Sequence, residues 1–159
     1  CMANQEGREH LKRLRTIWAS LRSIIYFVSI CTLDRTPVLD NAQVFEIVST
    51  TLREAAAKEK WLVGLYVVMP DHIHLFCSPA SDTADLSRFI MRFKSITTRR
   101  LWALGFPNRI WQREFHDHLL RSDESYEQKW EYVRRNPLGL SPDFDPQKWP
   151  YKGDLDKLE

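Results

Sequence analysis

Two apolar runs separated by a short break constrain the fold of this chain most strongly. Residues 61–70 (WLVGLYVVMP) and residues 72–78 (HIHLFCS) are both rich in β-branched, aromatic and other apolar residues. Runs of this length and composition are typical of buried strands. Because Pro70 and Asp71 make a tight break between the runs, the two strands are expected to be antiparallel neighbours in one sheet.

The flanking segments complete a pattern in which strands and helices alternate. Residues 23–32 (SIIYFVSICT) and 113–121 (REFHDHLLR) predict a first and a fourth strand. Apolar residues that recur every three or four positions predict amphipathic helices within 41–60 and 85–104. The order βαββαβ predicts an α+β fold of the ferredoxin-like type, an antiparallel sheet with helices on one face and the other face free for a ligand.

The helix caps and the chain ends are also suggested by the sequence. Short polar residues predict the caps, which are Ser81 or Thr83 for the helix of residues 85–104, and Ser122 or Asp123 for a last helix that reaches Asn136. Residues 1–20 predict a polar tail or short helix, and residues 138–159, rich in Pro and Asp, predict an irregular segment. A length of 159 residues fits a single domain over 1–159.

Composition argues against several classes of protein. No apolar run approaches the roughly 20 residues that span a bilayer, and no glycine-rich phosphate loop is present, so neither a membrane segment nor a nucleotide cofactor is expected. The three cysteines are widely spaced and form no CxxC pair, which indicates neither a disulfide framework nor a zinc knuckle and fits a cytoplasmic protein. The formal net charge of +2 is too small to show a nucleic-acid partner by itself.

Two HxH pairs lie within predicted strands, and the first is the better candidate for a metal site. Alternate strand residues point to the same face about 6.6 Å apart, so His72 and His74 can hold one ion together. Ile73 between them suits a core covered by helices, which would leave both imidazoles on the open face within reach of a substrate. A pair of packing or surface histidines is the alternative.

The second pair, His116 and His118, is separated by a carboxylate. If both histidines took the open face, Asp117 would be pushed inward at a substantial cost in free energy. These two histidines are therefore expected to support the metal ligands or contact the substrate rather than bind the ion.

The last predicted helix carries a candidate nucleophile. At 100° per residue, Tyr132 and Asn136 lie on its polar side, out of phase with the apolar Trp130. A phenol with a pKa near 10 needs a cation or a base to favour its anion, and a divalent ion held by the histidines and Asn136 would serve Tyr132 and also offset charge on a phosphate. A packing role for this tyrosine is the alternative, with Tyr126 and Tyr151 as fallback nucleophiles.

Basic residues form a stripe on the helix of residues 85–104 and continue beyond it. Its members are Arg88, Arg92 and Arg99, with Lys94 and Arg100 beside them and Arg109 and Arg113 after them. Such a stripe can follow the phosphates of DNA, and Trp102 and Trp111 offer flat surfaces for unpaired bases. A solvated helix face and core tryptophans are the plain alternatives.

Three segments of the chain, VVMPDHIHLF, IWQREFHDHLLR and YEQKWEYVRRNP, resemble a known family when taken in this order. They resemble the single-tyrosine HUH transposases, in particular the REP-associated tyrosine transposase branch, over about residues 23–139. The resemblance implies a ferredoxin-like fold with a C-terminal helix that bears the catalytic tyrosine, Mg²⁺ or Mn²⁺ as cofactor, and single-stranded DNA recognised near hairpins. It makes Tyr132 the catalytic tyrosine, His72 and His74 the metal-binding pair, and Asn136 the third ligand position, where other branches have Gln.

The activity implied is metal-dependent cleavage and strand transfer of single-stranded DNA through a 5′-phosphotyrosine intermediate. Two other readings stay open from the residues, a metal-dependent phosphodiesterase that uses activated water and a non-catalytic nucleic-acid-binding module. A monomer and a homodimer are also both open, because Tyr132 can meet the histidines of its own chain or those of a second subunit.

Overall fold

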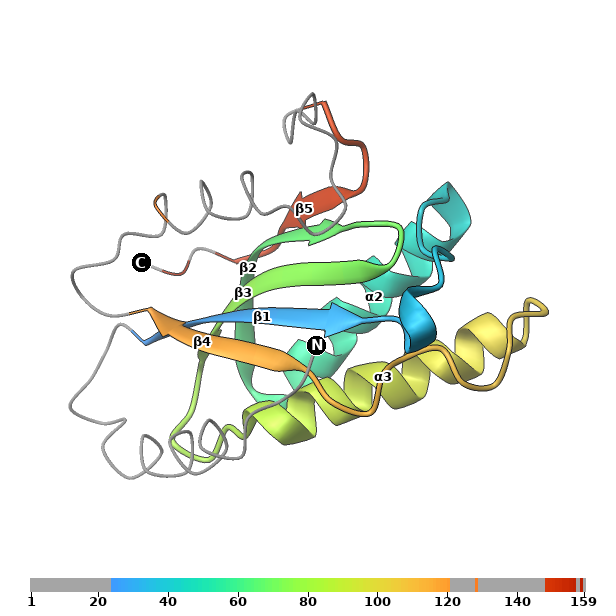
Figure 1. Ribbon diagram of the computed structural model, residues 1–159. Coiled ribbons are helices and arrows are strands. Elements are labelled where there is room, and N and C mark those ends of the chain that lie inside the picture. The colour runs from blue at the N-terminus through green and yellow to red at the C-terminus, as the bar shows by residue number, and fades with distance from the viewer. Residues whose placement is uncertain (1–23, 121–127, 129–147, 157, 159) are drawn as a thin grey trace.

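The computed structural model describes residues 24–120, 128, 148–156 and 158, which form a five-stranded sheet with helices packed against it (Figure 1). Its elements are β1 (Ile25–Cys31), the 3-10 helix η2 (Leu33–Arg35), α2 (Ala42–Glu59), β2 (Trp61–Val68), β3 (His72–Pro79), α3 (Leu86–Trp102), β4 (His116–Leu120) and β5 (Lys152–Asp154). The strand order is β4-β1-β3-β2-β5, and all four pairings are antiparallel. The predicted α+β fold of the ferredoxin-like type is therefore confirmed.

Helices α2 and α3 lie on the same side of the sheet (Figure 1). The strand residues that face them alternate along the chain, as Val28 and Ile30 do in β1 and Ile73 and Leu75 do in β3, and all four are fully buried in the main core. The residues between them, including His72 and His74, point to the opposite face. The strands predicted around 61–70 and 72–78 are thus confirmed as neighbours, and the period of two sets which side chains face away from the helices.

Helices α2 and α3 each begin at a side-chain cap. The side-chain oxygen of Asn41 accepts a hydrogen bond from the Val44 amide at the start of α2, and Asp85 accepts one from the Arg88 amide at the start of α3. The prediction that Ser81 or Thr83 caps α3 is wrong, because the Ser81 hydroxyl makes its hydrogen bonds to Thr83 within the preceding turn. A carboxylate one residue before the helix also complements the positive end of the helix dipole.

The segment after residue 138 is not wholly irregular, contrary to the prediction. Residues Lys152–Asp154 form β5, which pairs with the edge of β2 and supplies partners for backbone groups that would otherwise be open. The Val68 amide donates to the Tyr151 carbonyl, and the Trp149 indole N–H donates to the Val68 carbonyl. Gly153 is required at this place, because a Cβ there would collide with the ring of Tyr66.

The strand predicted over 113–121 begins at His116, because the residues before it cross the end of β1 in an irregular path with an isolated bridge between Thr32 and Trp111. The predicted tail of residues 1–20 lies outside the described residues, and so does nearly all of the predicted last helix, of which Gln128 is described and is helical. Those predictions and that of a single domain over 1–159 stay predictions.

Two further findings concern the cysteines and the membrane. Cys77 is a free, fully buried thiol, whereas Cys31 is disulfide-bonded, which the spacing of the cysteines did not lead us to expect. Among the described residues, no helix combines the length and the apolar character needed to cross a membrane.

Candidate functional site

The histidine pair lies on the central strand β3, on the face of the sheet away from the helices. The ring centroids of His72 and His74 are 4.5 Å apart, with an angle of 72° between the ring planes. The exposed fraction is 1% for His72 and 2% for His74. The face was predicted correctly, but the expectation that both imidazoles lie open to a substrate is wrong in this structure, because the period of a strand sets the face and not what covers it.

Each imidazole is held through its Nδ1 atom. The Nδ1 of His72 lies 2.7 Å from Oδ1 of Asp71, and the Nδ1 of His74 lies 2.7 Å from Oγ of Ser29, its direct neighbour across the β1–β3 pairing. Both Nε2 atoms are buried and have no hydrogen-bond partner within the described part of the chain. A proton on each Nδ1, donated to Asp71 and Ser29, satisfies both donors and leaves a lone pair on each Nε2.

Arg35 stabilises Asp71 in this arrangement. Its Nε donates to Oδ2 of Asp71 at 3.0 Å, while its terminal nitrogen is 3.4 Å from Nδ1 of His72. Asp34 and Arg35 both have positive φ, at 55° and 54°, a conformation that costs about 1 kcal/mol or more for residues other than glycine. The backbone of Asp71 is fixed in turn by the Thr32 amide and hydroxyl, which both donate to its carbonyl. The turn therefore places a cation beside Asp71 in spite of its backbone strain.

The electrostatics keep both imidazoles neutral. Burial lowers the pKa of His74 to about 3, with His72 and Arg35 adding to the shift. Burial also lowers the pKa of His72, although Asp71 opposes this effect. For Asp71 itself burial would raise the pKa, but hydrogen bonds from His72 and Arg35 outweigh it and lower the pKa, so the carboxylate stays ionised.

This arrangement fits a divalent metal ion. Metal-binding histidines are neutral, offer one ring nitrogen to the ion and donate the other N–H to a carboxylate, hydroxyl or carbonyl. His72 and His74 meet each of these requirements, and their unpartnered Nε2 atoms are the observation that tests the fit. Two imidazoles do not complete a coordination shell, and no group of three or more His, Cys, Asp or Glu residues suited to a metal occurs among the described residues. A further ligand of another type or from another part of the chain is needed.

The second HxH pair occupies the same face of the sheet. In the β1–β4 pairing His116 lies opposite Ser29 and His118 opposite Phe27, and both histidines are exposed. Asp117, opposite Val28, consequently points to the helix side, although we expected this orientation to be too costly. The cost is reduced because β4 is an edge strand and Asp117 is only partly buried. The expected role of His116 and His118 beside the site stays a prediction.

The predicted nucleophile and third ligand cannot be placed. Tyr132 and Asn136 lie outside the described residues, as does the fallback Tyr126. The other fallback, Tyr151, packs its ring against Phe45 with the centroids 5.5 Å apart, which indicates a packing role.

The basic stripe separates into paired and unpaired side chains. Arg92 donates to Glu59 at 2.6 Å and Arg100 donates to Glu54 at 2.7 Å, so two members are neutralised by carboxylates of α2. Four members make no ion pair within the part of the chain that the structure describes, namely Arg88, Arg99, Arg109 and Arg113. The sequence alone could not make this division, because it depends on how α2 and α3 pack.

The two tryptophans near the stripe differ in how far they are buried. Trp111 is buried, and its indole N–H donates to Thr97 at 2.9 Å, so its position favours the core reading over a stacking surface. Trp102 is 63% exposed and keeps its ring at the surface.

Most of this chain is similar in sequence to known transposases. Residues 20–136 match the family model described as "Transposase IS200 like". A Haemophilus influenzae protein assigned as a REP-associated tyrosine transposase is 26% identical over 80% of this chain and 77% of its own length. An uncharacterized protein of the same organism is 27% identical over 46% of this chain, and the match spans 52%, about half, of that relative's length.

Solved structures show the same fold. A REP-associated tyrosine transposase bound to a REP hairpin is similar with a TM-score of 0.65 and 21% identity, over 82% of this chain and 75% of the other. A protein described as a transposase from Deinococcus radiodurans is similar with a TM-score of 0.52 and 23% identity, over 69% and 88% of the two chains. The resemblance inferred from the sequence motifs is confirmed, and the chain belongs to the IS200-like transposase family, a class of enzymes that act on DNA.

Proposed function

We propose that this protein cleaves and rejoins single-stranded DNA with a divalent metal ion and the hydroxyl of Tyr132. The observation that carries the proposal is the pair of buried, neutral imidazoles of His72 and His74, whose Nε2 atoms have no partner in the described part of the chain. Leaving buried polar atoms unsatisfied costs free energy, which a bound ion would recover. Membership of the transposase family supports DNA as the substrate.

The proposed metal ligands are His72, His74 and Asn136, and the ion is Mg²⁺ or Mn²⁺. An amide oxygen suits either ion, while two imidazoles make Mn²⁺ at least as suitable as Mg²⁺. When bound, the ion would offset negative charge on the phosphate and favour the anionic form of a nearby phenol. Asp71 and Ser29 then serve to orient the two rings.

Tyr132 is the proposed nucleophile. Its phenolic oxygen attacks the phosphorus atom, the bond between phosphorus and the 3′ oxygen breaks, and overall the phenol proton passes to that oxygen. The products are a 5′-phosphotyrosine and a free 3′-OH. Because the covalent bond conserves the energy of the phosphodiester, attack by a 3′-OH can rejoin the strand without a nucleoside triphosphate.

The proposed substrate is single-stranded DNA next to a hairpin. This is supported by the fold shared with a transposase whose solved structure contains a REP hairpin. The proposal requires no nucleotide cofactor, and it holds for a monomer or for a homodimer.

A covalent-adduct assay tests the proposal. The protein is incubated with Mn²⁺ and a labelled oligonucleotide that carries a hairpin flanked by single strands, and a DNA–protein adduct is expected by denaturing electrophoresis. Tyr132→Phe should abolish both adduct and cleavage, whereas Tyr151→Phe, the matched control, should keep both. Full cleavage by Tyr132→Phe without an adduct would instead indicate a phosphodiesterase that uses water, and binding without any metal-stimulated cleavage would indicate a non-catalytic module.

Mixing two inactive variants tests the oligomeric arrangement. If Tyr132 acts on a site in a second subunit, Tyr132→Phe and His72→Ala should restore activity when mixed, because one mixed site then has both an intact tyrosine and intact histidines. If the protein acts as a monomer, the mixture stays inactive.

A further inference from the structure

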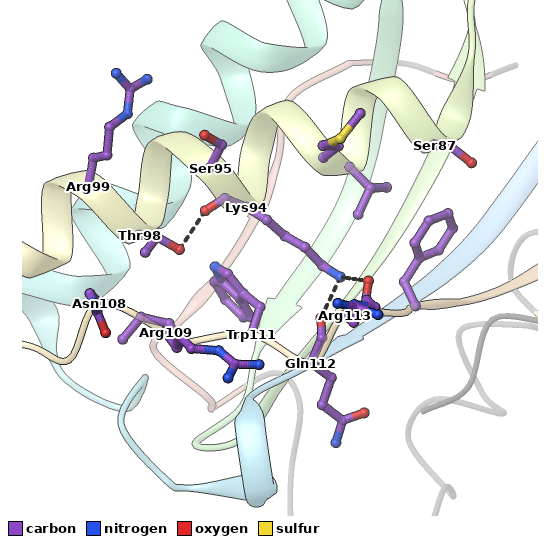
Figure 2. Close-up of a pocket in the computed structure, with 14 residues that line it drawn as sticks. Ser87, Lys94, Ser95, Thr98, Arg99, Asn108, Arg109, Trp111, Gln112 and Arg113 are labelled. Carbon is purple, nitrogen blue, oxygen red and sulfur yellow. Dashed lines mark hydrogen bonds between the residues drawn. The ribbon is translucent and has the colours of Figure 1, made fainter.

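A groove runs along the outer side of α3, between this helix and the connection that leads to β4. Its volume is about 640 Å³, and α3 lines one wall while residues 108–113 and Phe115 line the other (Figure 2). The groove belongs to the helix layer, whereas the histidine pair faces the other side of the sheet. It is therefore separate from the proposed metal site.

The groove has one sign of charge. Lys94, Arg99, Arg109 and Arg113 line it, and none of the lining residues that the structure describes has a carboxylate. The three arginines are exposed and make no ion pair within the described residues. On the side of α3 that faces α2 the carboxylates of Glu59 and Glu54 neutralise the arginines, so the unbalanced charge is confined to the groove side and the outer face of the helix.

The wall opposite α3 is fixed in place. The Lys94 ammonium donates to the backbone carbonyls of Gln112, Arg113 and Glu114, as its position in Figure 2 shows for the first two. The buried bond from Trp111 to Thr97 joins the same wall to the helix. A charged ligand would thus meet a wall that is already ordered, and binding would not bear the entropy cost of ordering a loop.

The groove chemistry fits a chain of phosphates better than a single one. Neutral donors, the hydroxyl of Ser95 and the amide of Asn108, lie among the cations, as in surfaces that contact a sugar-phosphate backbone. A smaller hollow over α3 is lined in part by the ion pair of Arg92 with Glu59, and beside it Arg88 and Arg99, unpaired within the described residues, continue the basic surface. The cationic area is therefore extended along the molecule, as a polymer of phosphates requires.

We propose that this groove binds the phosphodiester backbone of a DNA segment that lies outside the bond being cleaved. The proposal rests on the proposed function, because it makes the groove a second contact for the same substrate. Arg109 and Arg113 supply the phosphate contacts on one wall and Arg99 on the other, while the histidine pair and Tyr132 deal with the scissile phosphate on the opposite face. The groove thus adds affinity for DNA and takes no part in the chemical step.

Fluorescence anisotropy in EDTA over a range of salt concentrations tests this inference without any need for cleavage. The probes are a labelled DNA hairpin and an unpaired DNA strand of the same length. For Arg109→Gln/Arg113→Gln, the slope of log affinity against log salt should fall by about 0.7 to 0.9 for each phosphate that the variant no longer binds. Arg53→Gln, an exposed arginine on α2, is the control and should leave the slope unchanged. Arg109→Lys/Arg113→Lys should restore the wild-type slope, because lysine also binds phosphate as a point charge.

The outcomes are separable. A reduced slope with the hairpin alone assigns the groove to paired DNA, and one with the unpaired strand alone assigns it to single strands, and both results support the proposal. An unchanged slope with both probes overturns the proposal, and so does an equal loss of slope in Arg53→Gln. A tenfold preference for an RNA strand of the same sequence also overturns it.

If wild type binds DNA through the groove but never forms an adduct, the proposed function fails and this inference stands. If adducts form normally and the slope is unchanged, the proposed function stands and this inference fails.

Discussion

On one face of the sheet His72 and His74 are almost entirely buried and neutral, while in the helix layer Arg109 and Arg113 are exposed and charged. The first region depends on lone pairs held in a fixed geometry, away from water. The second depends on Coulomb attraction at the surface, which salt screens over about 8 to 10 Å at physiological ionic strength. The difference teaches that the two proposed roles, activation of the phosphate by the histidine side and affinity for DNA on the helix side, can be tested separately, since each responds to a different kind of perturbation.

Removal of a proposed metal ligand should give the largest effect. His74→Ala takes away one of the two unpartnered Nε2 atoms, and we expect the affinity for Mn²⁺ in isothermal titration calorimetry to fall by more than about 100-fold, beyond the effect of an outer partner. Gln43→Ala, an exposed residue of α2 on the other side of the sheet, is the control. DNA binding in EDTA should be unchanged in both variants. A matching loss of DNA binding in His74→Ala, with an unchanged thermal melt, would show that the two regions are not independent.

Removal of the carboxylate behind His72 should have the next largest effect. Asp71→Ala leaves the Nδ1 proton of His72 without its acceptor and frees the ring to turn, so the affinity for Mn²⁺ should fall by about 10- to 100-fold. Asp40→Ala changes an exposed carboxylate and should leave the titration unaltered. The idea that Asp71 positions His72 is abandoned if the two variants bind Mn²⁺ equally.

Local patterns were enough to predict most of the fold. The apolar and β-branched composition of 61–70 and 72–78 predicted the strands, the period of two predicted the face of His72 and His74, and the spacing in 41–60 and 85–104 predicted both helices. β5 was missed because three residues among prolines and aspartates carry no alternating pattern, and its pairing depends on the open edge of β2. The Asp85 cap was missed because several polar residues precede α3 and only the turn decides between them.

The candidate site was only partly predictable, because its supports come from distant parts of the chain. The HxH spacing identified His72 and His74, but Arg35 reaches Asp71 from 36 residues away through a turn with positive φ that no local pattern signals. Ser29 could have been found, since it is a polar residue inside an otherwise apolar predicted strand. The burial of the imidazoles could not be foreseen, because it depends on the packing of the whole chain.

A smaller effect is expected where the supporting group is neutral. Ser29→Ala removes the hydroxyl beside Nδ1 of His74, and a neutral hydrogen bond contributes about 0.5 to 1.5 kcal/mol, so the affinity for Mn²⁺ should fall by about 2- to 10-fold. Ser78→Ala is a close match, because this buried serine faces the same side of the sheet but donates to the Ile24 carbonyl. Equal titrations for the two variants would show that Ser29 does not orient the ring.

The smallest effect should distinguish paired from unpaired arginines in the helix layer. Arg92→Ala leaves the carboxylate of Glu59, which is 8% exposed, without its partner, so the free energy of unfolding in urea should fall by about 1 kcal/mol. Arg88→Ala removes an exposed arginine that makes no ion pair within the described residues, and the unfolding free energy should stay within about 0.5 kcal/mol. Because the charge of Arg92 is already offset by Glu59, its loss should leave the salt slope of DNA binding unchanged. A reduced slope in Arg92→Ala would mean that DNA displaces the carboxylate, and the basic surface would then extend to the α2 side of α3 as well.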